Sequence, residues 1–139
     1  MRLTLSFLLI FTFLGCTESK VNRKLPGSWS LVSHSYVDEF GFTINCANSS
    51  GNLVLGNCKK GDCTYSINYN YPCINTGDQV ESGTFMIESG GDNFLLFREN
   101  VDATIDTIEH SIMLLTNTDL KINYYEPTEK RRHMLVLSR

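Results

Sequence analysis

The sequence predicts an all-β protein, folded as an antiparallel up-and-down β-barrel of eight or nine strands. Long helical periodicity is almost absent, and short runs rich in β-branched and aromatic residues are separated by Gly, Asn and Asp. The links between these runs are short, which favours antiparallel neighbours. A meander of this kind leaves two unpaired edges unless it closes, and eight strands close around side chains or one small ligand. A two-sheet sandwich is the alternative architecture.

The clearest strand covers residues 63–71, where large and small residues alternate. Because side chains on a strand point to opposite faces in turn, Tyr65, Ile67, Tyr69 and Tyr71 should share one face of the sheet. The residues between them are small and polar, so the other face should contact water. This run therefore predicts a strand with one buried and one solvated side.

The other strands are predicted from shorter or less regular runs. Residues 89–92, Ser-Gly-Gly-Asp, form a turn signal between two of them, since glycine adopts positive φ without strain. The apolar phase changes between Ile105 and Ile108, which predicts a β-bulge there. In chain order the further expected strands are residues 28–37, 40–46, 53–56, 80–88, 93–98, 105–115, 119–125 and 132–138.

Charge and motifs exclude several classes of function. The formal net charge is −3, and phosphate recognition needs a clustered basic surface, so nucleic-acid binding is not expected. No nucleophile elbow, zinc-protease motif or phosphate loop is present. Asp102, Asp106 and Glu109 could act as paired carboxylates or bind calcium, but a solvated strand face explains them better. We expect no enzyme activity, no cofactor and no metal.

The N-terminus resembles a bacterial lipoprotein signal peptide. Arg2 precedes an apolar stretch, residues 3–14, which is followed by Gly15 and Cys16. The stretch is shorter than the roughly 20 residues of a membrane-spanning helix. The resemblance implies that residues 1–15 are removed and that Cys16 is lipidated. An ordinary cleaved signal and an uncleaved anchor are the alternatives.

This reading divides the chain into three parts. Residues 16–25 are polar and lack periodicity, and are expected to form a lipid-anchored flexible stalk. Residues 26–139 form the barrel domain, which is long enough for a real hydrophobic core. The protein is then expected in the cell envelope, anchored to a membrane through its N-terminal lipid, on the periplasmic or surface face of the outer membrane, and as a monomer.

Four cysteines remain once Cys16 is lipidated, and an exported chain favours disulfides. Four cysteines allow three pairings. We favour Cys58–Cys63, which would close the turn 59–62, together with Cys46–Cys73, which would staple a longer loop. Zinc binding is the alternative, but no Cys-x-x-Cys spacing is present.

Residues 25–33 resemble the opening of lipocalin-like domains, where Gly-x-Trp enters the first barrel strand; here the motif is Gly27-Ser28-Trp29. Small lipocalin-like lipoproteins of Bacteroidetes-type bacteria are similar over residues 25–139. The resemblance implies that Trp29 packs at the closed end of the barrel under an arginine close to the last strand. Arg139 is the candidate for that stack, with Arg131 or Arg132 as alternatives.

Two readings of the barrel interior follow. In the first, a small apolar or amphipathic ligand contacts the inward face, and the candidate lining residues are Trp29, Tyr65, Ile67, Tyr69 and Phe85. In the second, side chains fill the barrel and loops such as 59–62 engage a protein partner or inhibit it. An accessory subunit of an envelope assembly is a third option. The three histidines, His34, His110 and His133, are expected as separate surface or partly buried residues rather than as metal ligands.

Overall fold

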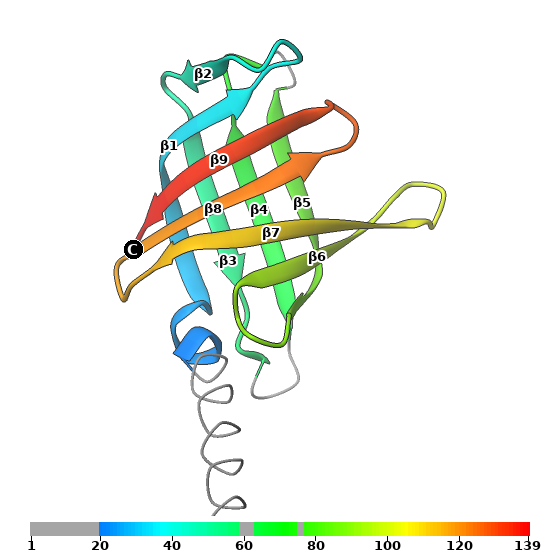
Figure 1. Cartoon of the computed structure of the whole chain (residues 1–139). Helices are drawn as coiled ribbons and strands as arrows, with labels where there is room; N and C mark the ends of the chain where they lie inside the picture. The colour runs from blue at the N-terminus through cyan, green and yellow to red at the C-terminus, as the bar shows by residue number, and fades with distance from the viewer. Residues whose placement is uncertain (1–19, 59–62, 75–76) are drawn as a thin grey trace, which may run out of the picture.

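A computed structural model describes residues 20–58, 63–74 and 77–139 of the chain. It confirms the predicted antiparallel barrel, with eight strands in the closed wall and one additional short strand (Figure 1). In chain order the strands are β1 (Gly27–Val37), β2 (Thr43–Cys46), β3 (Ser50–Leu55), β4 (Thr64–Asn70), β5 (Asp78–Ile87), β6 (Asn93–Glu99), β7 (Ile105–Leu115), β8 (Asp119–Glu126) and β9 (Arg131–Ser138).

The barrel closes between its first and last strands. Strand β1 pairs with β9 from Ser30 to Val37, so the two edges of the meander meet and no sheet edge remains between them. The other edge of β1 is shared, because β3 pairs with its first half and β2 with its second half. The additional strand β2 therefore extends the wall at the end of the barrel where β1 finishes (Figure 1).

The turn before β2 explains why this strand is shorter than expected. The carboxylate of Asp38 accepts hydrogen bonds from the backbone amides of Phe40 and Phe42, at 3.0 and 2.8 Å. An aspartate that binds amides two and four residues ahead stabilises a turn instead of a strand. Both phenylalanines are exposed at this tip.

Two local irregularities interrupt the strand pairing, and neither is the bulge predicted between Ile105 and Ile108. The pairing of β7 with β8 shifts between Ile112 and Leu114, and the expected bulge between Ile105 and Ile108 is not observed. A second shift interrupts β1 against β9 between Leu31 and Ser33. The phase change in the sequence instead reflects a difference in burial. Ile105, at the β6–β7 tip, is 65% exposed, whereas Ile108 is buried.

The structure corrects the expectation of a flexible stalk for residues 20–25. Residues 20–24 are helical, and the side chains of Val21 and Leu25 belong to the hydrophobic core. This helical segment lies under the end of the barrel where β1 begins (Figure 1). Its two apolar residues, four apart, share one helical face and cover that end. Cys16 and the rest of residues 1–19, and the loop 59–62, lie outside the described residues.

The closed end of the barrel is built around Trp29, as the resemblance implied. Its indole is fully buried and donates a hydrogen bond from Nε1 to the carbonyl of Leu25 at 2.8 Å. The Arg139 guanidinium lies 4.1 Å from the indole ring centre and donates to the carbonyls of Lys24 and Pro26. The last residue of the chain thus fixes both the helical segment and the tryptophan.

Both disulfides that we favoured are present, Cys46–Cys73 and Cys58–Cys63. The first joins the end of β2 to the segment after β4, and the second spans the loop between β3 and β4. Within the described residues, no helix is long and apolar enough to cross a membrane.

Candidate functional site

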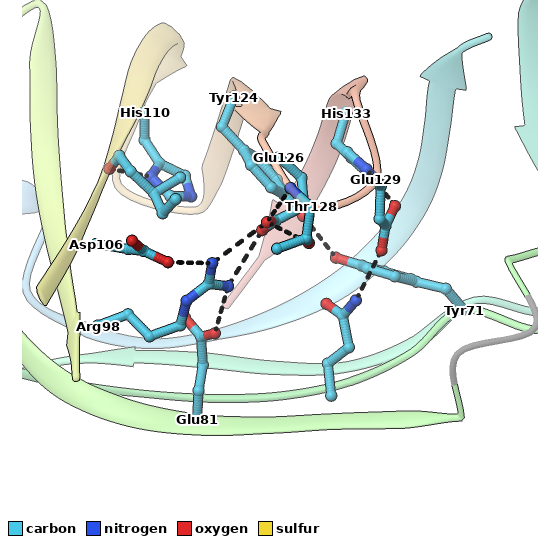
Figure 2. A network of polar contacts seen from close by, with 12 residues as sticks. Tyr71, Glu81, Arg98, Asp106, His110, Tyr124, Glu126, Thr128, Glu129 and His133 are labelled. Atoms are coloured by element: carbon cyan, nitrogen blue, oxygen red, sulfur yellow. Dashed lines mark hydrogen bonds and ion pairs between the residues drawn. The ribbon is translucent and has the colours of Figure 1, made fainter. Parts of the chain in front are cut away.

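The interior of the barrel changes from apolar to polar along its axis. Near the start of β1 the buried Trp29 lies beside Leu25 and Leu53. Near the end of β1 the buried His34 lies beside His133 and Tyr71. Burying polar groups costs free energy unless they are hydrogen-bonded, so this end should form a connected network. We call this end, where β1 finishes, the mouth of the barrel, and Figure 2 shows its polar network from close by.

Aromatic and imidazole rings form a continuous stack through the polar end. The three histidines are 3%, 4% and 0% exposed and two of them are in contact, which corrects our expectation of separate, surface or partly buried residues. His110 and His133 point inward because they are in phase with the buried Ile108 and Leu135 of their strands. His34 is not in phase with Trp29 and points inward after the register shift between Leu31 and Ser33. The ring centres are 4.8 Å apart for Phe94–His110, 4.6 Å for His110–Tyr124, 5.0 Å for Tyr124–His133, 5.1 Å for His133–His34 and 4.0 Å for His34–Tyr71.

Two of the histidines belong to a polar chain that crosses the mouth. His34 Nε2 and His133 Nδ1 are 2.9 Å apart, and His133 Nε2 lies 3.0 Å from a carboxylate oxygen of Glu129. That last pair is close enough for an electrostatic contact but is misaligned for a hydrogen bond. Glu129 also accepts from Gln79 Nε2 at 3.2 Å, which links the β8–β9 turn to β5.

The histidines are held neutral. Burial, together with a smaller effect of the neighbouring His133, lowers the pKa of His34 to about 4. Burial likewise lowers the pKa of His110 to about 4, against smaller opposing effects of the Ile108 carbonyl and Glu126. The pKa of His133 is also lowered by burial, although Glu129 opposes this. These side chains therefore act as neutral hydrogen-bonding groups at pH 7.

Arg98 is the centre of a second cluster, beside the first. Its guanidinium contacts the carboxylates of Glu126 at 3.2 and 3.3 Å, Glu81 at 3.4 Å and Asp106 at 3.3 Å. Burial opposes the charge of Arg98, but the hydrogen bonds and charges of these partners outweigh it and raise its pKa. The cluster carries three carboxylates and one guanidinium, a formal charge of −2. It joins β5, β6, β7 and β8 across the mouth (Figure 2).

Glu126 is the most buried carboxylate of this cluster, with its side chain 10% exposed. Burial alone would raise its pKa, but hydrogen bonds from Arg98 and Thr128 prevail and lower it. The Thr128 hydroxyl and amide donate to it at 2.7 and 3.3 Å. Glu126 is thus a charged group that depends on its partners.

The Arg98 cluster separates two spaces. Inside lies a cavity of about 20 Å³, bordered by Tyr69, His110, Tyr124 and Glu126 among others. Outside lies a groove of about 780 Å³ over the outer faces of β3, β4 and β5 and the β6–β7 tip. Ile67, Glu81 and Arg98 border both. These three side chains therefore form the partition between the interior and the outer groove.

Tyr69 is the polar side chain of this site that lacks a partner. Its hydroxyl is buried and has no hydrogen-bond partner among the described residues, although Tyr69 borders the inner cavity. Burial raises the pKa of Tyr69 well above its usual value, so the phenol stays neutral and can donate. An unsatisfied buried hydroxyl costs about 1–3 kcal/mol, which makes it a candidate contact for a bound molecule or a water.

The predicted lining residues all face the interior. Trp29, Tyr65, Ile67, Tyr69 and Phe85 are all buried. Ile67 and Tyr69 border the inner cavity. Trp29 lies at the closed end, and the Tyr65 hydroxyl donates to Glu81 at 3.1 Å. All five residues are thus inside the barrel as expected, but only Ile67 and Tyr69 line the inner cavity.

Sequence reasoning missed the charged members of the site. Glu81 is two residues from Gly83 and four from Phe85 on the inward face of β5, and Arg98 is in phase with Phe94 and Leu96. The same period-two rule that identified the tyrosines would have placed these charges inside. Among the carboxylates weighed earlier, Asp106 joins the cluster, whereas Asp102 and Glu109 are exposed.

One group of side chains has spacing suited to a metal. Ligand atoms of His34, Cys46 and Cys73 lie within 4.8 Å of one another among the described residues. The two cysteines are joined in a disulfide, so they do not offer the thiolates that a metal requires.

Comparisons with known proteins support the fold alone. No protein-family model and no curated protein matches the sequence. Among solved structures, the chain is similar to a redesigned β-barrel at 14% identity, covering 86% of this chain and 94% of that one, with a TM-score of 0.51. It also matches the bovine lipocalin allergen Bos d 2 at 13% identity, covering 85% and 74%, with a TM-score of 0.45.

Proposed function

We propose that this chain is a lipid-anchored envelope protein that binds a small polar or amphipathic ligand at the mouth of its lipocalin-like barrel, without catalysis. The observation that carries the proposal is the partition at Arg98, together with the buried, unpaired hydroxyl of Tyr69, a residue that borders the inner cavity. A binding site of this kind needs a few convergent polar groups that orient the ligand beside apolar walls. Tyr69, Glu81 and Glu126 supply these groups.

The proposal moves the expected ligand from the barrel centre to its mouth. A lipid-sized apolar molecule needs a cavity of some 300 Å³ or more, whereas the inner cavity measures about 20 Å³. Buried apolar side chains such as Trp29, Leu25 and Leu53 fill the apolar half of the barrel. The outer groove, in contrast, has room for a small molecule whose head enters at Arg98.

Anchoring through Cys16 is part of the same proposal. The helical residues 20–24 lie at the closed end of the barrel, and only three residues separate Cys16 from residue 20. Four steps of extended chain reach about 14 Å. A lipid on Cys16 would therefore hold the closed end near the membrane and leave the mouth facing away from it. Mass spectrometry of the N-terminal peptide tests this, with a Cys16→Ser variant as control.

The binding proposal is tested by native mass spectrometry of the purified protein, followed by identification of small molecules released on denaturation. We expect a molecule retained by the wild type and lost or much reduced in Tyr69→Phe, which removes only the buried hydroxyl. Tyr125→Phe is the matched control, because Tyr125 is 51% exposed on the outer surface. Equal retention by both variants, or none by the wild type, would reject the site.

A protein-interaction module with a side-chain-filled barrel is the second candidate. It is favoured by the small inner cavity and by Phe40 and Phe42, which are 76% and 67% exposed on one tip at the mouth end. Exposed aromatic residues are enriched in protein interfaces. Cross-linking in intact cells distinguishes this candidate, because a partner of the tip should be lost when both residues are replaced by serine.

A further inference from the structure

We propose that the ligand of this site is a small organic cation, with an ammonium or guanidinium head and a short aliphatic body, and that its head replaces the Arg98 guanidinium. This inference rests on the proposed binding site at the mouth. It names the chemistry that the site selects.

The charge of the site argues for a cation. Glu81, Asp106 and Glu126 surround a single guanidinium, so the cluster keeps a formal charge of −2 when Arg98 is in place. An anion would have to approach these three carboxylates, and a neutral ligand would leave their charge unchanged. Like charges brought together in a partly dry site repel strongly, which disfavours anions.

The hydrogen-bonding groups argue for a ligand rich in donors. Glu81 and Glu126 offer carboxylate oxygens, and His110 lies with Nδ1 3.2 Å from the Ile108 carbonyl. The tautomer that donates from Nδ1 to that carbonyl leaves Nε2 of His110 as an acceptor. The Tyr69 hydroxyl can accept as well as donate. Ammonium and guanidinium groups carry three to five donors and no acceptor.

The walls of the site suit the same class of ligand. Tyr69 and Tyr124 border the inner cavity, and a cation that reached it would lie near their rings. The outer groove presents three valines, of which Val80 and Val101 are strongly exposed, and these could cover an aliphatic body. The groove and the cavity meet at Arg98. The cationic head of the ligand would therefore lie on the cavity side and its aliphatic body on the groove side.

Arg98 can act as a gate between groove and cavity because it is held by hydrogen bonds rather than by packing alone. Its side chain is 20% exposed and borders the outer groove. A competing cation forms the same charge-assisted bonds to Glu81 and Glu126, so exchange conserves the number of ion pairs. The displaced Arg98 head then enters water, which solvates its charge.

The test uses agmatine, a four-carbon guanidinium amine, with pentanol and pentanoate as the neutral and anionic controls. Titration is followed by NMR at the Arg98 Nε–Hε signal and at the Tyr69 ring. We expect saturable shifts with agmatine, and an Arg98 signal that moves towards that of a solvated arginine. Neither control compound should produce them. Saturable shifts with pentanol or pentanoate at the same residues would refute the proposal that the ligand is a cation. They would still support a ligand-binding site at the mouth.

Variants separate a ligand site from a structural ion cluster. Arg98→Ala should bind agmatine at least tenfold more tightly than the wild type, because the internal competitor is gone. Glu126→Gln and Glu81→Gln should each weaken binding at least fivefold in the otherwise unchanged chain. Arg132→Ala, which removes an exposed arginine of β9, should stay within twofold of the wild type.

One result would refute the exchange directly. If Arg98→Ala binds agmatine while the wild type does not, Arg98 is a permanent part of the fold and not a gate. The two glutamine variants keep the test decisive even where Arg98→Ala does not fold, since unchanged agmatine affinity in both would equally refute the proposal.

Discussion

His34 Nε2 and His133 Nδ1 share a hydrogen bond of 2.9 Å inside the barrel, and neither imidazole is more than 3% exposed. One nitrogen must donate and the other accept, so the contact requires at least one neutral ring. Protonating both would place two positive charges side by side away from water. The pair therefore ties the packing of the barrel mouth to pH.

The stability of the protein should fall as the pH is lowered from about 6.5 to about 4. The pKa values of His34 and His110 are about 4 in the folded protein, below the 6.5 of an unfolded histidine. In this window the unfolded chain binds more protons, so acid favours unfolding, and the loss ends below pH 4. Urea denaturation from pH 7.5 to pH 4 measures it.

A variant assigns part of this dependence to one residue. His110→Phe keeps a ring between Phe94 and Tyr124 but cannot take up a proton. It should reduce the loss of unfolding free energy over the window by about 2–3 kcal/mol, since each unit of pKa shift corresponds to about 1.4 kcal/mol. A slope identical to that of the wild type would show that His110 does not contribute.

Removing Arg98 should destabilise the fold, and neutralising its partner Glu126 as well should restore part of the lost stability. Arg98→Ala leaves three carboxylates without their common cation, and Glu126 is largely buried. Breaking such a pair costs about 3 kcal/mol, because the remaining charge is uncompensated. Arg98→Ala combined with Glu126→Gln should recover about 1 kcal/mol or more. Thermal and urea unfolding measure both, and Arg132→Ala should change stability by less than about 0.5 kcal/mol.

Gly83 illustrates a position where the barrel wall leaves no room for a side chain. A Cβ atom there would lie 2.3 Å from the Phe97 carbonyl oxygen and 2.9 Å from the Tyr65 ring. The backbone of β6 would have to move, and overpacking of this kind costs about 1–3 kcal/mol. Gly83→Ala should therefore lower the unfolding free energy by at least that amount. Ser82→Ala, one residue away on the outer face, is the control and should have little effect.

The fold could be predicted from the sequence because its signals are local. Alternation from Tyr65 to Tyr71 identifies a strand face, and the short glycine-rich turns identify antiparallel neighbours. The helical residues 20–24 were not predicted because five residues carry too little periodicity. They are held by tertiary contacts, such as that of Leu25 with Trp29.

The site was harder to predict because its residues are distant in sequence and unusual for a core. Arg98 meets Glu126 across 28 positions, and His34 meets His133 across 99. Charged and imidazole side chains are usually exposed. This general preference argued for the surface, although the alternation along the strands places several of these residues inside the barrel. Here the closed barrel overrides that preference by supplying partners from several strands.

The two disulfides should contribute unequally to stability. Cys46–Cys73 closes a loop of 27 residues and Cys58–Cys63 a loop of 5. The entropy lost by the unfolded chain grows with loop length, which gives about 3.5 kcal/mol for the first and about 2 kcal/mol for the second. Replacing Cys46 and Cys73 by serine should thus cost more than replacing Cys58 and Cys63. Urea unfolding of the two paired-serine variants tests this order. The reverse order would mean that the short loop constrains the native β3–β4 connection through contacts of its own.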